Sequence, residues 1–194
     1  MSRLVFAALS VLTLTAAACA DTPKAPTAIS ASPGISADRA NVLDGARLVK
    51  IHDECDPATF NAAFNDPTIC VKQGHVTFDR FIAELTKTQQ AGQWRFDPSD
   101  VELDARQNLF AINNGGEVHT FTRVAKYAGG IIPLLNDLTG NTEVAPECTA
   151  LEADDFVAPG ATYTAELNAD EIQHFQCCIH PWMKTDIRVK NRGS

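Results

Sequence analysis

The feature that most constrains the fold of this chain is a period of two in its residues, which begins near Trp94 and runs to the C-terminal segment. Mostly apolar positions alternate with polar ones at Val101, Leu103, Ala105, then Phe110, Ile112, then Tyr163, Ala165, Leu167, and finally Thr185, Ile187, Val189. Such alternation is typical of strands with one buried face. Turn sequences such as NNGG and APGA separate the runs. We therefore expect a mainly β fold, an antiparallel β-sandwich.

A helical pattern precedes the strands. Thr77 is a plausible N-cap, and the residues after it place apolar side chains on one helical stripe: Phe78, Phe81, Ile82 and Leu85. A shorter helix is predicted from Ala58 to Phe64, after the start signal Asp56-Pro57, and Gly92 is expected to end the helical region.

Composition divides the chain into four parts. Residues 1–20 have the pattern of an export signal, and residues 21–45, rich in Ala, Ser, Pro and Thr, are expected to be a flexible linker. Residues 46–92 are expected to be an N-terminal α-helical extension that packs against a β domain over residues 93–191. Within that domain, residues 125–159 interrupt the alternation and predict an inserted loop or short helix.

The export signal contains a cysteine with two interpretations. Arg3 precedes the apolar run LVFAALSVLTLT, and the sequence LTAAACA around Cys19 resembles the lipobox of bacterial lipoproteins, although Ala16 stands where leucine is usual. Lipidation of Cys19 would anchor the mature chain to a membrane. The alternative is ordinary signal-peptidase cleavage after Ala20. Both interpretations predict an exported protein of the bacterial periplasm or cell envelope.

The charge balance limits the partners. The 24 acidic residues outnumber the 16 basic ones, which gives a net charge of -8, and no basic cluster is present to neutralise phosphates. Nucleic acid is therefore not an expected partner. Protein partners with basic surfaces are expected instead.

The residues that indicate chemistry lie in the segment FQCCIHPWMKTDIRV. Cys177, His180 and Met183 follow the spacing CxxHxxM, which brings a thiolate, an imidazole and a thioether to one turn between two strands. A second imidazole is available from His119, which follows the strand NLFAIN and the turn NGGEV. Two histidines, a cysteine and a weak methionine ligand are typical of type 1 copper. The sequence therefore predicts one copper ion per chain at these four residues.

With these motifs the chain resembles the cupredoxins of the plastocyanin, pseudoazurin and amicyanin group, over roughly residues 94–190. The resemblance implies a Greek-key β-sandwich that moves single electrons between redox proteins. It also implies that Asn113 helps to hold the site. Thr120 departs from the family, which usually has Asn at this position, so any tie from Thr120 to the cysteine turn must use its hydroxyl. Pro181 and Trp182 would form part of an apolar partner surface beside His180. The alternative for Trp182 is a place in the core.

The six cysteines predict two disulfides. Cys177 is assigned to the metal, and Cys55 is expected to pair with Cys70 in an oxidising compartment. Strand alternation turns Cys178 away from its neighbour, which leaves it free to pair with Cys148.

Other functions fit less well. A copper oxidase or nitrite reductase needs more histidines than the five present, so no enzyme activity is expected and a monomeric electron carrier is favoured. Copper delivery or storage without redox turnover remains an alternative. His52, His75 and His174 are expected to have surface or structural roles, although HDEC around His52 also permits a second metal site.

Overall fold

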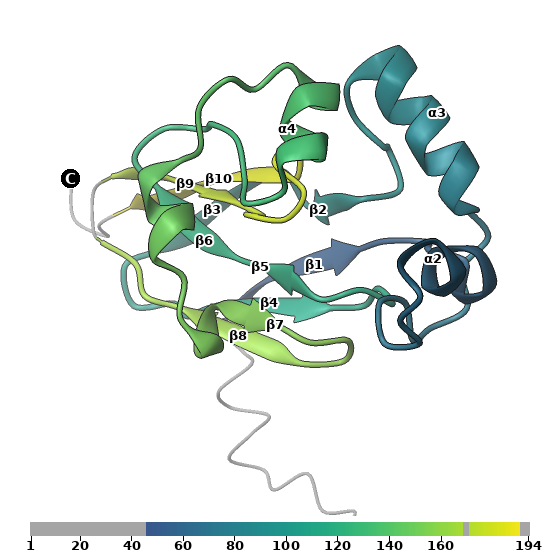
Figure 1. Cartoon of the computed structure of the whole chain (residues 1–194). Coiled ribbons are helices and arrows are strands. Elements are labelled where there is room, and N and C mark those ends of the chain that lie inside the picture. The colour runs from purple at the N-terminus through teal and green to yellow at the C-terminus, as the bar shows by residue number, and fades with distance from the viewer. Residues whose placement is uncertain (1–45, 169–170, 191–194) are drawn as a thin grey trace, which may run out of the picture. The chain divides into compact units, whose positions relative to one another are not determined.

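The computed structural model describes residues 46–168 and 171–190, which form two four-stranded sheets with a shared core (Figure 1). The first sheet has the order β2-β1-β4-β8 and consists of Arg95–Asp97, Arg47–His52, Leu109–Asn113 and Thr162–Ala165. The second has the order β3-β10-β9-β6 and consists of Asp100–Asp104, Lys184–Lys190, Ile172–Gln176 and Thr122–Val124. A small pair is formed by β5 (His119–Thr120) and β7 (Phe156–Val157). The predicted mainly β sandwich is confirmed.

The strand pairing differs from a purely antiparallel sandwich. Strand β1 runs parallel to β4, with Val49 opposite Ala111, and β10 runs parallel to β3, with Ile187 opposite Val101. Both parallel pairs join strands that are far apart in the sequence. Parallel neighbours need long connections, and turn sequences between adjacent runs do not reveal them.

Strand β1 also corrects the predicted domain boundary. Residues 47–52 were assigned to a helical extension, but they form a strand that pairs with both β2 and β4. Val49 and Ile51 are fully buried in the core. The two predicted helices therefore lie within an insertion between β1 and β2, and β1 belongs to the sandwich.

Phe121 connects the two sheets at the centre of the core. Its ring lies 5.1 Å from Phe96 of the first sheet and stacks at 4.6 Å on Phe175 of the second. The residue follows β5 directly, so its burial fixes the end of the strand that carries His119. Burying aromatic rings of this size contributes strongly to the stability of a core.

Two helices pack at one end of the sandwich, at the right in Figure 1. Helix α2 (Pro57–Phe64) begins after Asp56, whose carboxylate accepts from the Thr59 N–H, and α3 (Phe78–Thr88) begins after Thr77, whose hydroxyl accepts from the Arg80 N–H. Both predicted helices are thus confirmed with their N-caps. The expected end at Gly92 is wrong, because α3 ends at Thr88 and is capped by Gln89 in a left-handed conformation. Their aromatic side chains form one cluster with Trp94: Phe60, Phe78 and Phe81.

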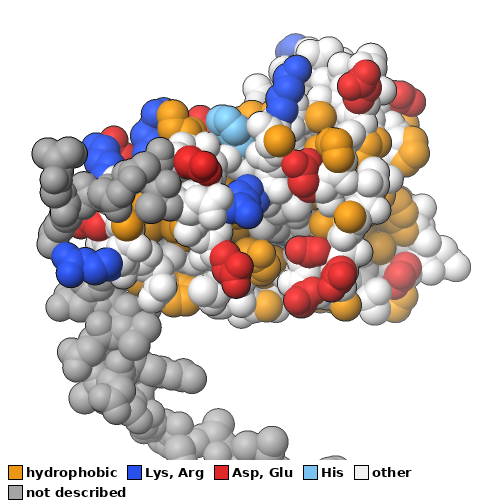
Figure 2. Space-filling view, turned by 90° about the vertical axis from the view of Figure 1, so that its left-hand side faces the viewer, with side chains coloured by type: hydrophobic (Ala, Val, Ile, Leu, Met, Phe, Trp, Pro, Cys, Tyr) orange, Lys and Arg blue, Asp and Glu red, His pale blue; other side chains and the backbone are white. Residues whose placement is uncertain are grey.

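The predicted interruption of the strand pattern is helical in part. Helix α4 (Pro133–Thr139) and two short 3-10 turns, Pro146–Ala150 and Ala153–Asp155, lie between β6 and β7. Helix α4 contacts α3, so the three helices gather on one side of the sheets. On the side that lies at the left in Figure 1, acidic, basic and apolar side chains are interspersed (Figure 2).

The expected export signal, the linker and Cys19 fall in residues 1–45, outside the described part of the chain. Among the described residues, none of the helices combines the length and the apolar character needed to cross a bilayer.

Candidate metal centre

Three of the four predicted ligands meet in the structure. The turn between β9 and β10 carries Cys177 and His180, and strand β5 carries His119. The Cys177 Sγ lies 3.7 Å from Nδ1 of His119 and 3.8 Å from Nδ1 of His180. All three donor atoms lie within 4.8 Å of one another and are buried. Residues 58 positions apart in the chain thus converge on one point.

The turn itself is closed by backbone hydrogen bonds. The Cys177 N–H donates to the carbonyl of Met183 at 3.1 Å, and the Met183 N–H donates to the carbonyl of His180 at 3.0 Å. Met183 is buried with 1% of its surface exposed. The backbone therefore holds Cys177, His180 and Met183 in one tight loop at the end of the second sheet.

The separation of the donor atoms fits a metal ion. Typical metal distances are about 2.3 Å to a thiolate and about 2.0–2.1 Å to an imidazole, which separates sulfur and nitrogen by about 3.5–3.6 Å at a tetrahedral angle and about 3.7–3.8 Å at a trigonal one. The observed 3.7 and 3.8 Å fall in this range. Cys177 is also the free cysteine of the described chain. The donor set therefore has both the chemistry and the spacing of a metal site.

Asp53 orients His119. Its Oδ2 lies 2.9 Å from Nε2 of His119, and both side chains are buried. Burial alone would raise the pKa of Asp53, but hydrogen bonds from His119 and from the backbone of Gly116 and Glu117 lower it to about 2. Because an ionised carboxylate only accepts, Nε2 of His119 must carry a hydrogen. Nδ1 is then directed at Cys177.

The backbone around Asp53 holds its carboxylate in place. Backbone N–H groups of Gly116 and Glu117 donate to its two oxygens at 2.9 and 3.0 Å, and the Cys55 N–H donates at 3.3 Å. A β-carbon at Gly115 would overlap the carboxylate, so this position requires glycine. The turn NNGG therefore encloses the carboxylate of Asp53 and also reverses the direction of the chain.

The sulfur of Cys177 is held in a polar environment. It accepts hydrogen bonds from the backbone N–H groups of Thr120 and His180, each at 3.4 Å. Burial raises the pKa of this thiol, but the hydrogen bonds of His119 and His180 outweigh burial and hold the pKa well below its usual range. In the metal-free protein, burial lowers the pKa of His119, but Asp53 and Cys177 raise it to about 10. The metal-free pair is thus a thiolate beside an imidazolium.

Thr120 and Asn113 fix the two ligand segments. The Thr120 hydroxyl accepts from the Cys178 N–H at 2.7 Å, which ties β5 to the cysteine turn. The Asn113 side chain donates to the carbonyls of Glu117 and Val157, both at 2.8 Å, and accepts from the Gly115 N–H at 2.9 Å. Asn113 therefore sets the loop that leads to His119.

Two disulfides lie close to the centre. Cys55 is bonded to Cys70 beside α2, and Cys148 is bonded to Cys178, which ties the 3-10 turn to the residue after Cys177. Cys177 and Cys178 belong to different packing clusters. One neighbour thus remains a free thiol while the other anchors the loop.

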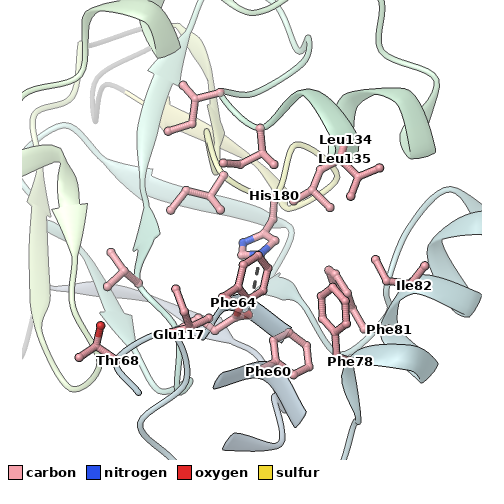
Figure 3. A pocket seen from close by; sticks show the side chains of 15 residues that line it. Phe60, Phe64, Thr68, Phe78, Phe81, Ile82, Glu117, Leu134, Leu135 and His180 are labelled. Atoms are coloured by element: carbon pink, nitrogen blue, oxygen red, sulfur yellow. Dashed lines mark ion pairs between the residues drawn. The ribbon is translucent and has the colours of Figure 1, made fainter. Parts of the chain in front are cut away.

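The ring of His180 is enclosed by the inserted helices. It contacts Phe81 at 6.4 Å and Trp182 at 5.3 Å between ring centroids, and only 3% of the residue is exposed. Its Nε2 lies 3.8 Å from Oε2 of Glu117 (Figure 3). Trp94 Nε1 donates to the same oxygen. Burial is the main cause that raises the pKa of Glu117.

The expected partner surface at Pro181 and Trp182 needs correction. Pro181 is buried and Trp182 is only partly exposed. Trp182 Nε1 donates to the carbonyls of Ala91 and Trp94, both at 3.1 Å, and its ring contacts Phe81. The insertion between β1 and β2 therefore covers Trp182, which belongs to the helix interface.

The remaining histidines lie away from the centre. His75 and His174 pair with Glu54 and Asp186 on the partly exposed surface. His52 Nε2 lies 3.9 Å from Asp97. Burial lowers the pKa of His52, and its Nε2 makes no hydrogen bond among the described residues. His52 is therefore a partly buried residue of the first sheet, while its neighbour Asp53 belongs to the centre.

Sequence reasoning missed Asp53 and Glu117. Asp53 lies in HDEC, for which the sequence predicts a surface or structural role of His52 or a second metal site, and Glu117 stands two residues before His119. Two signals were available in the sequence. Asp53 is a carboxylate that directly follows an apolar strand, and Glu117 is a carboxylate inside the loop that leads to His119. The pairing of β1 with β4 brings Asp53 to the loop that contains Glu117.

Fold and site together define a mainly β sandwich with a buried cluster of two histidines and a cysteine. No protein-family model and no curated protein matches the chain. Solved structures similar to it include a mutant plastocyanin of fern, with 14% identity and a TM-score of 0.38 over 74% of this chain and 100% of that one. A reduced amicyanin variant has 15% identity and a TM-score of 0.37 over 77% and 87%. A purple cupredoxin from Nitrosopumilus maritimus has 15% identity and a TM-score of 0.35 over 51% and 85%.

Proposed function

We propose that the chain is an exported copper protein that carries single electrons, with His119, Cys177, His180 and Met183 as the ligands of one type 1 copper. The observation that carries the proposal is the buried triangle of one sulfur and two nitrogens, with edges of 3.7 and 3.8 Å from the sulfur. Thiolate and imidazole together select copper among redox metals, and the buried thioether of Met183 is a suitable weak fourth ligand. When bound, copper would supply the exchange of one electron between Cu(I) and Cu(II).

The protein's own residues would keep the donor atoms in place during that exchange. Asp53 holds the ring of His119, and two backbone N–H groups hold the sulfur of Cys177. The side chains of the triangle are buried, which excludes water from the donor atoms. A site whose donors are already fixed needs little rearrangement when its charge changes by one, and this favours a carrier over an enzyme.

The exchange partner is proposed to be another redox protein with a basic surface, because the chain carries a net charge of -8. Export to the bacterial periplasm or cell envelope is supported by the two disulfides, which persist in oxidising compartments. Lipidation of Cys19 remains part of the proposal, and intact-mass measurement of the exported chain tests it.

The test is the visible and paramagnetic resonance spectrum of the protein loaded with Cu(II). We expect an intense absorption from the thiolate that disappears on one-electron reduction and returns on oxidation. Cys177→Ser should abolish the absorption, whereas His75→Gln, at an exposed histidine outside the centre, should leave it unchanged. A colourless protein that binds only Cu(I) would overturn the carrier function in favour of copper delivery or storage.

A further inference from the structure

A cavity of about 390 Å³ opens beside His180, between the inserted helices and α4. Phe64 of α2 and Phe78 and Phe81 of α3 lie on one side of the cavity (Figure 3). Leu134 and Leu135 of α4 lie on the opposite side. This volume is typical of small-molecule sites, whereas a benzene-sized guest fills an apolar cavity of about 150 Å³. The space therefore suits a compound of one or two rings.

The mouth of the cavity is apolar and open. Phe64 and Leu134 are each 55% exposed, and Ile131, Ile132 and Val118 are also exposed. Large apolar residues that gather around one opening are unusual on a protein that has no ligand for them. The mouth gives a ligand access to the rings of α2 and α3.

The floor of the cavity offers one unused acceptor. Glu117 lines the cavity and is 8% exposed. Its Oε2 accepts from Trp94 and lies near His180, but Oε1 has no hydrogen-bond partner among the residues that the structure describes. A carboxylate oxygen of a cavity-lining residue that has no protein donor is available to a ligand hydrogen.

We propose that this cavity binds a small aromatic molecule of one or two rings, which donates a hydroxyl or amino hydrogen to Oε1 of Glu117. The rings of Phe64, Phe78 and Phe81 provide edges and faces for an aromatic guest. The single acceptor fixes its orientation. A bound molecule would also lie against the ring of His180. The binding site for this molecule would therefore adjoin the proposed metal centre.

The test uses two probes of nearly equal shape, 2-naphthol and 2-methoxynaphthalene, of which only the first has a hydrogen to donate. Calorimetric titration of the copper-loaded chain should show one 2-naphthol per chain, bound at least about tenfold more tightly than the ether. Glu117→Gln should reduce that preference. The same titration is repeated with the metal-free protein. This tests binding in the cavity whether or not the proposed copper function is correct.

Variants at the mouth locate the binding. Phe64→Ala should weaken 2-naphthol about tenfold through lost ring contact. Val71→Ala, at an apolar residue that is 59% exposed and does not line the cavity, should leave the affinity unchanged. Absence of saturable binding overturns the proposal. Equal affinity for the two probes also overturns it and would instead indicate a groove for apolar side chains of a partner protein.

Discussion

Asp53 gives the most direct test of how the centre is assembled. Its carboxylate accepts four hydrogen bonds, from Nε2 of His119 and from the N–H groups of Gly116, Glu117 and Cys55. Replacing it by alanine leaves these donors without an acceptor in a buried place. We expect Asp53→Ala to destabilise the metal-free, disulfide-bonded protein more than any single exposed carboxylate does.

The magnitude follows from two routes. A pKa of about 2 in the folded protein, against 3.8 for a free aspartate, corresponds to about 2 kcal/mol in favour of the ionised form. Removal of one member of a buried, hydrogen-bonded charge pair costs about 3–5 kcal/mol. Asp53→Asn should therefore cost about 2–3 kcal/mol and Asp53→Ala about 3–5 kcal/mol. Because the folded pKa is lowered, this contribution is present above pH 4 and is lost as the pH falls from about 4 to about 2.

The assay is denaturant unfolding of the metal-free chain at pH 7, repeated towards acid. Glu54→Gln is a matched control, because Glu54 forms a similar pair with His75 at 3.1 Å but on the exposed surface, where such pairs contribute at most about 1 kcal/mol. If Asp53→Ala costs no more than Glu54→Gln, the claim that Asp53 organises the centre is refuted.

Three further outcomes are expected. Because the pKa of His119 is raised to about 10 in the metal-free protein, one proton must leave before a metal binds. The apparent copper affinity in competition titrations should therefore rise about tenfold per pH unit between pH 7 and about 9. A flat profile would contradict this. The free energy of unfolding of the double variant Cys148→Ser, Cys178→Ser, measured by chemical denaturation, should fall by about 3–4 kcal/mol, as estimated for a loop with a sequence separation of 30. The variant should keep the copper absorption of Cys177. Phe81→Ala should cost about 3–5 kcal/mol in the same assay because the ring is buried, and a loss as small as that of the exposed Phe64→Ala would show that the helix interface contributes little.

Local patterns in the sequence were sufficient for the helices and for part of the site. The N-caps at Asp56 and Thr77 and the apolar stripe of α3 depend on neighbouring residues. The turn CxxHxxM likewise places its proposed ligands within a few residues. The alternation in β10 also gave the buried face correctly, with Thr185, Ile187 and Val189 buried.

Contacts between distant segments were not readable in the same way. In β4 the buried residues are Leu109, Ala111 and Asn113, whereas Phe110 and Ile112 are half-buried, because both faces of this strand carry large side chains. The strand β1 was missed because its run is short and is followed by helices. The role of Asp53 depends on the parallel pairing of β1 with β4, and no local pattern encodes that pairing.

The adjacency of Cys177 and Cys178 has a consequence for maturation. In an unfolded chain, Cys148 can be oxidised with either thiol, and the two loops differ by one residue, so closure entropy does not distinguish them. Only native packing separates the pair, since Cys178 faces the cluster of Cys148 while Cys177 faces the main core. Correct oxidation must therefore follow folding of the last two strands, or be corrected by thiol exchange afterwards. A chain oxidised too early would be a covalent isomer that has lost its sulfur donor.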